Sequence, residues 1–313
     1  MVGKTSLEQT HAGCQQLFTQ AQPSAKFWKL LQFPLIRILL VGLFFLPFLA
    51  FHNTIVADLI VAAPEPKRSF LHYGDSILSV VVILLLYALY VRWVEKRKAV
   101  ELSGEGAIAE LGVGWLISSG IVVGMVVLMW MAGYYKIADT GSGKALVDAI
   151  FVFGIGALVQ VLLFRLIIFR LLEEFVGTWV ALVSVSATFG FAHLGNENAT
   201  VWAAVALAAA DVIMIAPFVL TRRLWMAWGL HWSWNFMQDG VFGMPNSGIT
   251  ELPSWIVAAI GGPHWLTGGR FGIEASVIVV IVSLAVGLLM LKIAIERDQI
   301  LSPVWRRRRS QTA

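Results

Sequence analysis

The sequence predicts an all-α, multi-pass bundle of about eight transmembrane helices, with the N-terminus and the C-terminus in the cytoplasm. Its composition indicates this class, because 58% of the 313 residues are apolar, 13% are charged and the mean hydropathy is +0.78. Soluble proteins carry about 25% charged residues, so this chain lacks the charge to cover a surface that faces water on all sides. The same scarcity excludes a nucleic-acid-binding or disordered protein, and the single Cys14 excludes a disulfide scaffold.

Apolar runs of the length that a bilayer requires, about 20 residues, follow one another along the chain. The apolar stretch 55–63 is too short to cross a bilayer, and we expect it in the loop after the first span. The expected spans are residues 34–51, 76–94, 112–136, 145–172, 178–195, 199–220, 224–240 and 273–295.

Basic residues gather in alternate connecting segments, and this pattern predicts the orientation. They occur before the first span, between 92 and 98, at Arg222 and Arg223, and in the tail that holds Arg306 to Arg309. Because cytoplasmic loops carry an excess of Lys and Arg, we expect both termini inside. The chain is therefore predicted to be a multi-pass protein of a bacterial inner membrane or a plasma membrane, with the lipid bilayer as its partner and no nucleic acid bound.

Polar residues inside the expected spans are concentrated in the second half of the chain. A charge at the membrane centre costs about 2.5–3.5 kcal/mol, so such a residue is a functional candidate by default. The candidates are Gln160, Arg165, Arg170, His193, Asp211, His231, Asn235 and Asp239.

Each of the two histidines lies one helical turn from another residue of interest. Phe189 and His193 are four residues apart, and so are His231 and Asn235, so each pair lies on one helix face. We expect two helices to present two imidazoles and a carboxamide to a shared interior, which suits acyl transfer or metal-assisted hydrolysis. The alternative is hydrogen bonding between helices, which contributes only about 0.6 kcal/mol in membranes.

The two spacings occur in segments that resemble a known family. TFGFAHL, from Thr188, and LHWSWNF, from Leu230, are similar to the FxxxH and HxxxN motifs of the CAAX prenyl protease and bacteriocin-processing (CPBP, or Abi) family, of the bacterial type. The similarity runs from about 150 to 280. Together with the expected spans and the basic tail, it divides the chain into four parts: a cytoplasmic segment 1–33, N-terminal transmembrane helices 34–140, a protease-like core 141–296 and a basic cytoplasmic tail 297–313.

The family's first motif, EExxxR, is degenerate in this chain. Counting back from Arg165, its two glutamate positions hold Gln160 and Val161. The resemblance implies that His193 is the partner of the base that activates water, that His231 and Asn235 are oxyanion donors, and that Arg165 closes the first motif. Gln160 cannot take a proton from water, although its amide can orient a water molecule.

Another carboxylate has to be considered in place of the missing glutamates. Glu173 and Glu174 lie about 20 Å further along a helix and fit the charged end of the fourth span. Asp211, in the middle of a span, is either a counter-ion for Arg165 or a relocated base.

The resemblance implies a CAAX-type intramembrane endopeptidase scaffold that acts on membrane-associated or prenylated peptides. The degenerate motif leaves open a catalytically inactive adaptor or immunity protein that binds a peptide or lipid. A small-solute transporter is a further alternative, although no inverted repeat is evident. A divalent metal such as zinc, held by His193, His231 and a carboxylate, is also possible, although the chain has no HExxH motif.

Overall fold

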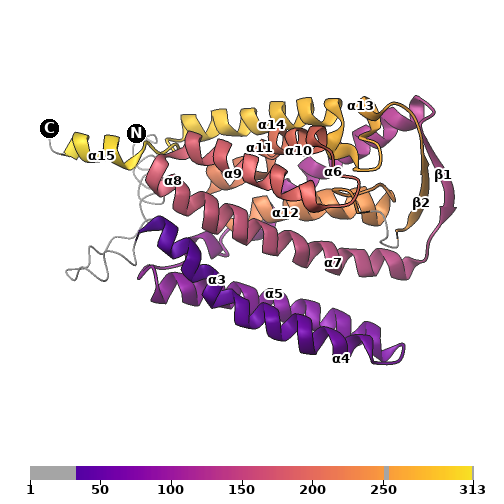
Figure 1. Cartoon of the computed structure of the whole chain (residues 1–313), viewed down its shortest axis with the longest axis horizontal. Coiled ribbons are helices and arrows are strands. Elements are labelled where there is room, and N and C mark those ends of the chain that lie inside the picture. Colours follow the sequence, from indigo (N-terminus) through magenta and orange to yellow (C-terminus); the bar gives the residue numbers. More distant parts are fainter. Residues whose placement is uncertain (1–32, 250–253, 312–313) are drawn as a thin grey trace.

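A computed structural model describes residues 33–249 and 254–311, and helices account for most of these residues (Figure 1). The predicted class, a multi-pass helical bundle, is confirmed: seven helical runs in the described residues are long and apolar enough to cross a membrane. They are Pro34–Val61, Lys67–Trp93, Ala107–Met131, Gly143–Val176, Thr178–Gly195, Val201–Thr221 and Val277–Glu296. Helix α3 begins, and α15 ends, at the same end of the molecule (Figure 1). The expected cytoplasmic segment 1–33 lies, except for Phe33, outside the described residues.

Three of these seven runs are single helices, and the other four join two or more helical elements. The helices are α3 (Pro34–Phe51), α4 (Ala57–Val61), α5 (Lys67–Trp93), α6 (Ala107–Met131), α7 (Gly143–Val161), α8 (Arg170–Val176), α9 (Thr178–Ala192), α10 (Val201–Ala210), α11 (Val212–Thr221), α12 (Leu224–Asn235), α13 (His264–Thr267), α14 (Val277–Glu296) and α15 (Val304–Gln311).

The prediction for the apolar stretch 55–63 is wrong. Instead of forming a loop, most of it continues the first helix, because a π-helical segment, His52–Val56, joins α3 to α4 without a break. Pro47 inside α3 does not end the helix either. A further π-helical segment, Leu162–Phe169, joins α7 to α8 in the fourth run.

The expected span 224–240 forms a helix that differs from the other seven. Helix α12 continues into a π-helical segment, Phe236–Val241, but this run is not among the apolar candidates for crossing a membrane. It packs against α6, α7 and α11, and most of its side chains are buried. The helix that carries the HxxxN motif is therefore enclosed by other helices, which explains how it can include polar and tryptophan side chains.

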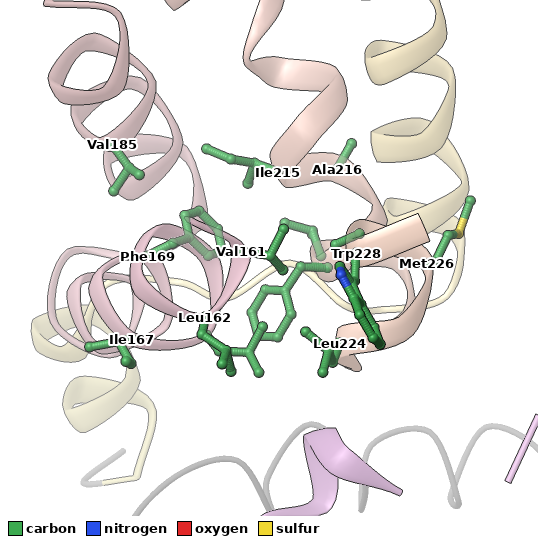
Figure 2. Packing of buried hydrophobic residues seen from close by; sticks show 14 of the residues in the cluster. Val161, Leu162, Ile167, Phe169, Val185, Ile215, Ala216, Leu224, Met226 and Trp228 are labelled. Atoms are coloured by element: carbon green, nitrogen blue, oxygen red, sulfur yellow. The ribbon is translucent and has the colours of Figure 1, made fainter. Parts of the chain in front are cut away.

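One apolar core holds α7, α9, α11 and α12 together. Figure 2 shows Val161, Leu162 and Phe169 gathered with side chains such as Val185 and Ile215. Val161 is 1% exposed, so the position of the family's second glutamate belongs to the packed core.

Glycine allows α6 and α12 to cross closely. A Cβ atom at Gly229 would collide with the backbone carbonyl of Leu111, and one at Gly114 would collide with that of Met226. This contact sets the depth of α12 in the bundle.

A two-stranded sheet closes the opposite end of the bundle from α15 (Figure 1). Strands β1 (Tyr135–Thr140) and β2 (Ile256–Ile260) pair antiparallel, with Tyr135 opposite Ile260 and Thr140 opposite Ile256. The sheet ties the segment before α7 to the long segment after α12.

Arg170, one of the polar candidates, belongs to a buried ion network away from the other candidates. It pairs with Glu95 and Glu101, which also bind Arg97; the distances from Arg97 Nε to Glu95 Oε2 and from Arg97 Nη1 to Glu101 Oε2 are 2.7 and 2.8 Å. Burial alone would raise the pKa of Glu95, but Arg170, Arg97 and Arg37 outweigh burial and lower it. Opposite charges thus compensate for the desolvation of this network.

Candidate active site

A cavity of about 350 Å³ lies inside the bundle, between the helices of the second half of the chain. Its lining includes Gln160 from α7, His193 at the end of α9, Asp211 at the junction of α10 and α11, and His231 and Asn235 from α12. Of the eight polar candidates from the sequence, these five and Asp239 line the cavity, whereas Arg165 and Arg170 do not. Side chains from four separate helical regions therefore line one cavity.

The ring of Phe189 joins the histidines and the arginine of the motifs. Its centroid lies 4.6 Å from that of His193 and 6.3 Å from that of His231. On the same ring, the Cζ atom of Arg165 lies 4.8 Å from the centroid, a distance at which a cation–π interaction forms. The phenylalanine of the FxxxH motif thus packs between the charged residue and both imidazoles.

The backbone fixes the orientation of the His193 imidazole. Nδ1 lies 2.7 Å from the carbonyl oxygen of Phe189. Because a carbonyl oxygen can only accept, Nδ1 carries the proton in this contact, and in a neutral imidazole Nε2 then holds the lone pair. His193 is therefore arranged to accept a proton or a hydrogen bond through Nε2.

Tryptophan hydrogen bonds anchor α12 to α7 and so position His231 and Asn235. Trp228 Nε1 and Trp232 Nε1 each donate over 2.9 Å, to the carbonyl oxygens of Gly154 and Ile150. His231 is 4% exposed, and its Nδ1 has no hydrogen-bond partner in the described protein. Asn235, one turn further on, is half-buried on the cavity wall. Both side chains are available to a group that enters the cavity.

Arg165 forms a fully buried ion pair with Asp211. Arg165 Nη2 donates to Asp211 Oδ1, and Arg165 Nε donates to the carbonyl oxygen of Met214 at 3.4 Å. The second oxygen of Asp211, Oδ2, has no hydrogen-bond partner in the described protein. Asp211 is thus the counter-ion of Arg165 and at the same time part of the cavity wall.

Two further carboxyl groups line the cavity, and neither had an assigned role. Asp239 lies on the π-helical turn after α12, two helical turns beyond His231, and Glu274 lies just before α14. Glu274 Oε2 accepts from Gln238 Nε2 at 2.7 Å, and its Oε1 accepts from the backbone N–H of Ser247 at 3.0 Å. Asp239 is eight residues, about two helical turns, after His231, and this spacing could have predicted that it faces the same cavity. Glu274 lies outside that helix, so no helical spacing relates it to His231.

The described residues offer no ready metal site. No three His, Cys, Asp or Glu side chains among them come together as a group that could hold a metal ion. Zinc binding by His193, His231 and a carboxylate therefore stays a prediction, and we derive no step through a metal.

The segment that carries most of the polar cavity residues is similar to a family of CAAX proteases. Residues 142–237 match the family model described as Rce1-like, type II CAAX prenyl endopeptidase Rce1-like. This segment includes Gln160, Arg165, His193, Asp211, His231 and Asn235, and the match confirms the resemblance to the CPBP family. No curated protein and no solved structure matches the chain.

Proposed function

We propose that this protein is a slow intramembrane endopeptidase that cleaves membrane-associated or prenylated peptides at the cavity. The observation that carries the proposal is the shared cavity lined by Gln160, His193, His231 and Asn235. Two hydrogen-bond donors on one helix face and a proton acceptor on another are the groups that hydrolysis of a peptide bond requires.

In the proposed reaction, water attacks the carbonyl carbon of the scissile bond. Nε2 of His193 accepts a proton from the water, while the side-chain oxygen of Gln160 orients it. The C–O bond forms as the carbonyl electrons move to oxygen, and an N–H of His231 and the amide of Asn235 stabilise this oxyanion. The C–N bond then breaks, and the imidazolium of His193 returns its proton to the leaving amine.

The substitution at position 160 makes the proposed enzyme slow. A positioned general base contributes about 10² to 10⁴ in rate, and Gln160 cannot act as one. His193 alone has to accept the proton, without a carboxylate beside it at position 160 to assist.

A peptide-binding adaptor or immunity protein is the second candidate, and one observation favours it. Both glutamate positions of the first motif are replaced, by Gln160 and by Val161. Val161 is packed in the apolar core, so its position serves packing instead of chemistry. Such a protein would bind a membrane peptide in the same cavity without cleaving it.

A cleavage assay separates the two candidates. The purified full chain, in lipid nanodiscs, is given a quenched fluorescent prenyl-CAAX peptide, and His193→Ala is compared with His264→Ala, the same change at an exposed histidine that does not line the cavity. We expect slow hydrolysis by the wild type and by His264→Ala, and none by His193→Ala. Peptide binding without hydrolysis by the wild type would favour the adaptor, and hydrolysis that survives in His193→Ala would contradict the proposed mechanism.

A further inference from the structure

The end of the cavity beyond Asn235 carries two buried carboxyl groups that face the same space. Asp239 is 5% exposed and Glu274 is 3% exposed. Both line the cavity, and the negative charge of Glu274 acts on Asp239. Two buried acidic side chains therefore share the wall of one cavity.

The two carboxyl groups differ in the partners that they have. Glu274 is held by neutral donors, namely the side chain of Gln238 and the backbone and hydroxyl of Ser247, the last at 3.2 Å. Asp239 Oδ2 is buried and has no hydrogen-bond partner in the described protein. A buried carboxylate without a partner is costly, so a group that binds Asp239 would gain most of its affinity there.

The cavity wall supplies no cation to compensate these carboxyls. None of the described residues that line it is a lysine or an arginine. The guanidinium of Arg165, which lies against the cavity residue Phe189, is paired with Asp211. Asp239 and Glu274 therefore leave this end of the cavity with an excess of negative charge.

Aromatic side chains on the same wall suit an organic cation. Trp234 and Phe153 line the cavity with Asp239, and the ring of Phe153 packs close to Gly240, the residue that follows Asp239. Rings of this kind attract ammonium and guanidinium groups, more strongly where water is excluded.

We propose that the Asp239–Glu274 end of the cavity binds the side-chain ammonium or guanidinium of a basic residue in the peptide. This inference rests on the proposed function, since it makes that peptide the ligand of the same cavity. Asp239 lies one turn beyond Asn235 on the same helix, so the basic side chain would lie beside the peptide bond whose carbonyl Asn235 contacts. The site would thus select peptides with a lysine or arginine next to the scissile bond.

A binding measurement that does not depend on cleavage tests this site. The full chain in nanodiscs at pH 8 is titrated calorimetrically with N-acetyl-lysine methylamide and with N-acetyl-norleucine methylamide, which lacks only the terminal ammonium. We expect the lysine compound to bind at least about tenfold more tightly to the wild type, as a desolvated charge pair would produce. Equal binding of the two compounds would overturn the proposal.

Variants test whether Asp239 and Glu274 cause the preference for the lysine compound over the norleucine compound. Asp239→Asn should reduce it to about twofold or less, whereas Asp139→Asn, the same change at an exposed aspartate in β1, should leave it intact. Glu274→Gln should weaken the preference, which provides a second measurement if Asp239→Asn folds poorly. A preference for lysine that survives in both cavity variants would contradict the assignment.

A third probe, and a comparison with the cleavage assay, complete the design. If n-butylammonium binds as tightly as the lysine compound, the cavity recognises a free amine, and the assignment to a peptide is wrong. A lysine preference without hydrolysis of any peptide would leave the cation site standing and contradict the proposed protease. Hydrolysis without a lysine preference would support the proposed protease and contradict the cation site.

Discussion

Arg165 and Asp211 lie 46 positions apart in the sequence and form an ion pair in which both side chains are completely buried. The family's first motif would offer Arg165 a glutamate at position 161, where this chain has valine. Asp211, from the junction of two short helices, supplies the negative charge instead. The arginine is thus kept in the membrane interior by a partner from another part of the chain.

Replacing Asp211 by asparagine should destabilise the protein strongly. The change leaves the guanidinium of Arg165 buried without a counter-ion, which typically costs about 3–5 kcal/mol. The free energy of unfolding, measured by SDS titration in mixed micelles, would reveal the loss. The double variant Arg165→Met, Asp211→Leu should recover much of it, because no buried charge remains. An Asp211→Asn variant with unchanged stability and activity would contradict both roles considered for this residue.

Alanine at Gly229 should force α6 and α12 apart. Its Cβ atom would collide with the carbonyl of Leu111, and overpacking of this kind costs about 1–3 kcal/mol. Because His231 is two residues further along α12, the displacement should also reduce ligand binding in the cavity. Gly120→Ala on α6, where an added Cβ meets open space, is the matched control, and equal melting temperatures for the two variants would show that this crossing is not tight.

The stability of the fold should depend on pH through Glu274. Burial raises the pKa of its carboxyl from 4.5 to about 7. Between these values the folded protein binds a proton that the unfolded chain has released, so stability falls as the pH rises from 4.5 to 7, by on the order of 3 kcal/mol. Melting curves of the wild type and Glu274→Gln across this range should converge at low pH and diverge above pH 7, with the variant the more stable. Glu296→Gln, at an exposed position, should follow the wild type. Parallel curves for all three proteins would contradict the burial effect.

The sequence predicts the helical bundle well because long apolar runs carry that information directly. It fails at the stretch 55–63, where the apolar length alone suggested a loop. The decisive feature is a π-helical turn at His52–Val56 that continues the helix, and apolar length does not encode such a turn. The run Leu224–Val241 is helical as expected, but its neighbours, rather than its own hydropathy, keep it inside the bundle.

Helical spacing predicted which motif residues of the candidate site share a cavity, whereas the sequence did not predict the residue that a loop contributes. The spacings 189–193 and 231–235 predicted a shared interior, and His193, His231 and Asn235 do line one cavity; their catalytic roles stay predictions. Glu274 reaches the same cavity through a loop that folds back, with Gly248 packed against Glu197 and Gly272 packed against Pro245. Contacts of this kind depend on backbone paths with positive φ, which a pattern of residue types does not reveal.

The most direct test of the central claim is the rate of peptide hydrolysis by Gln160→Glu. The variant places a carboxylate on the wall of the cavity that His193 also lines, and it leaves the core position Val161 unchanged. The account predicts that kcat for a quenched fluorescent prenyl-CAAX peptide rises by about 10² to 10⁴ with little change in KM. A folded Gln160→Glu protein that hydrolyses the peptide no faster than the wild type would contradict the claim that this cavity is a hydrolytic centre slowed by the missing carboxylate at position 160.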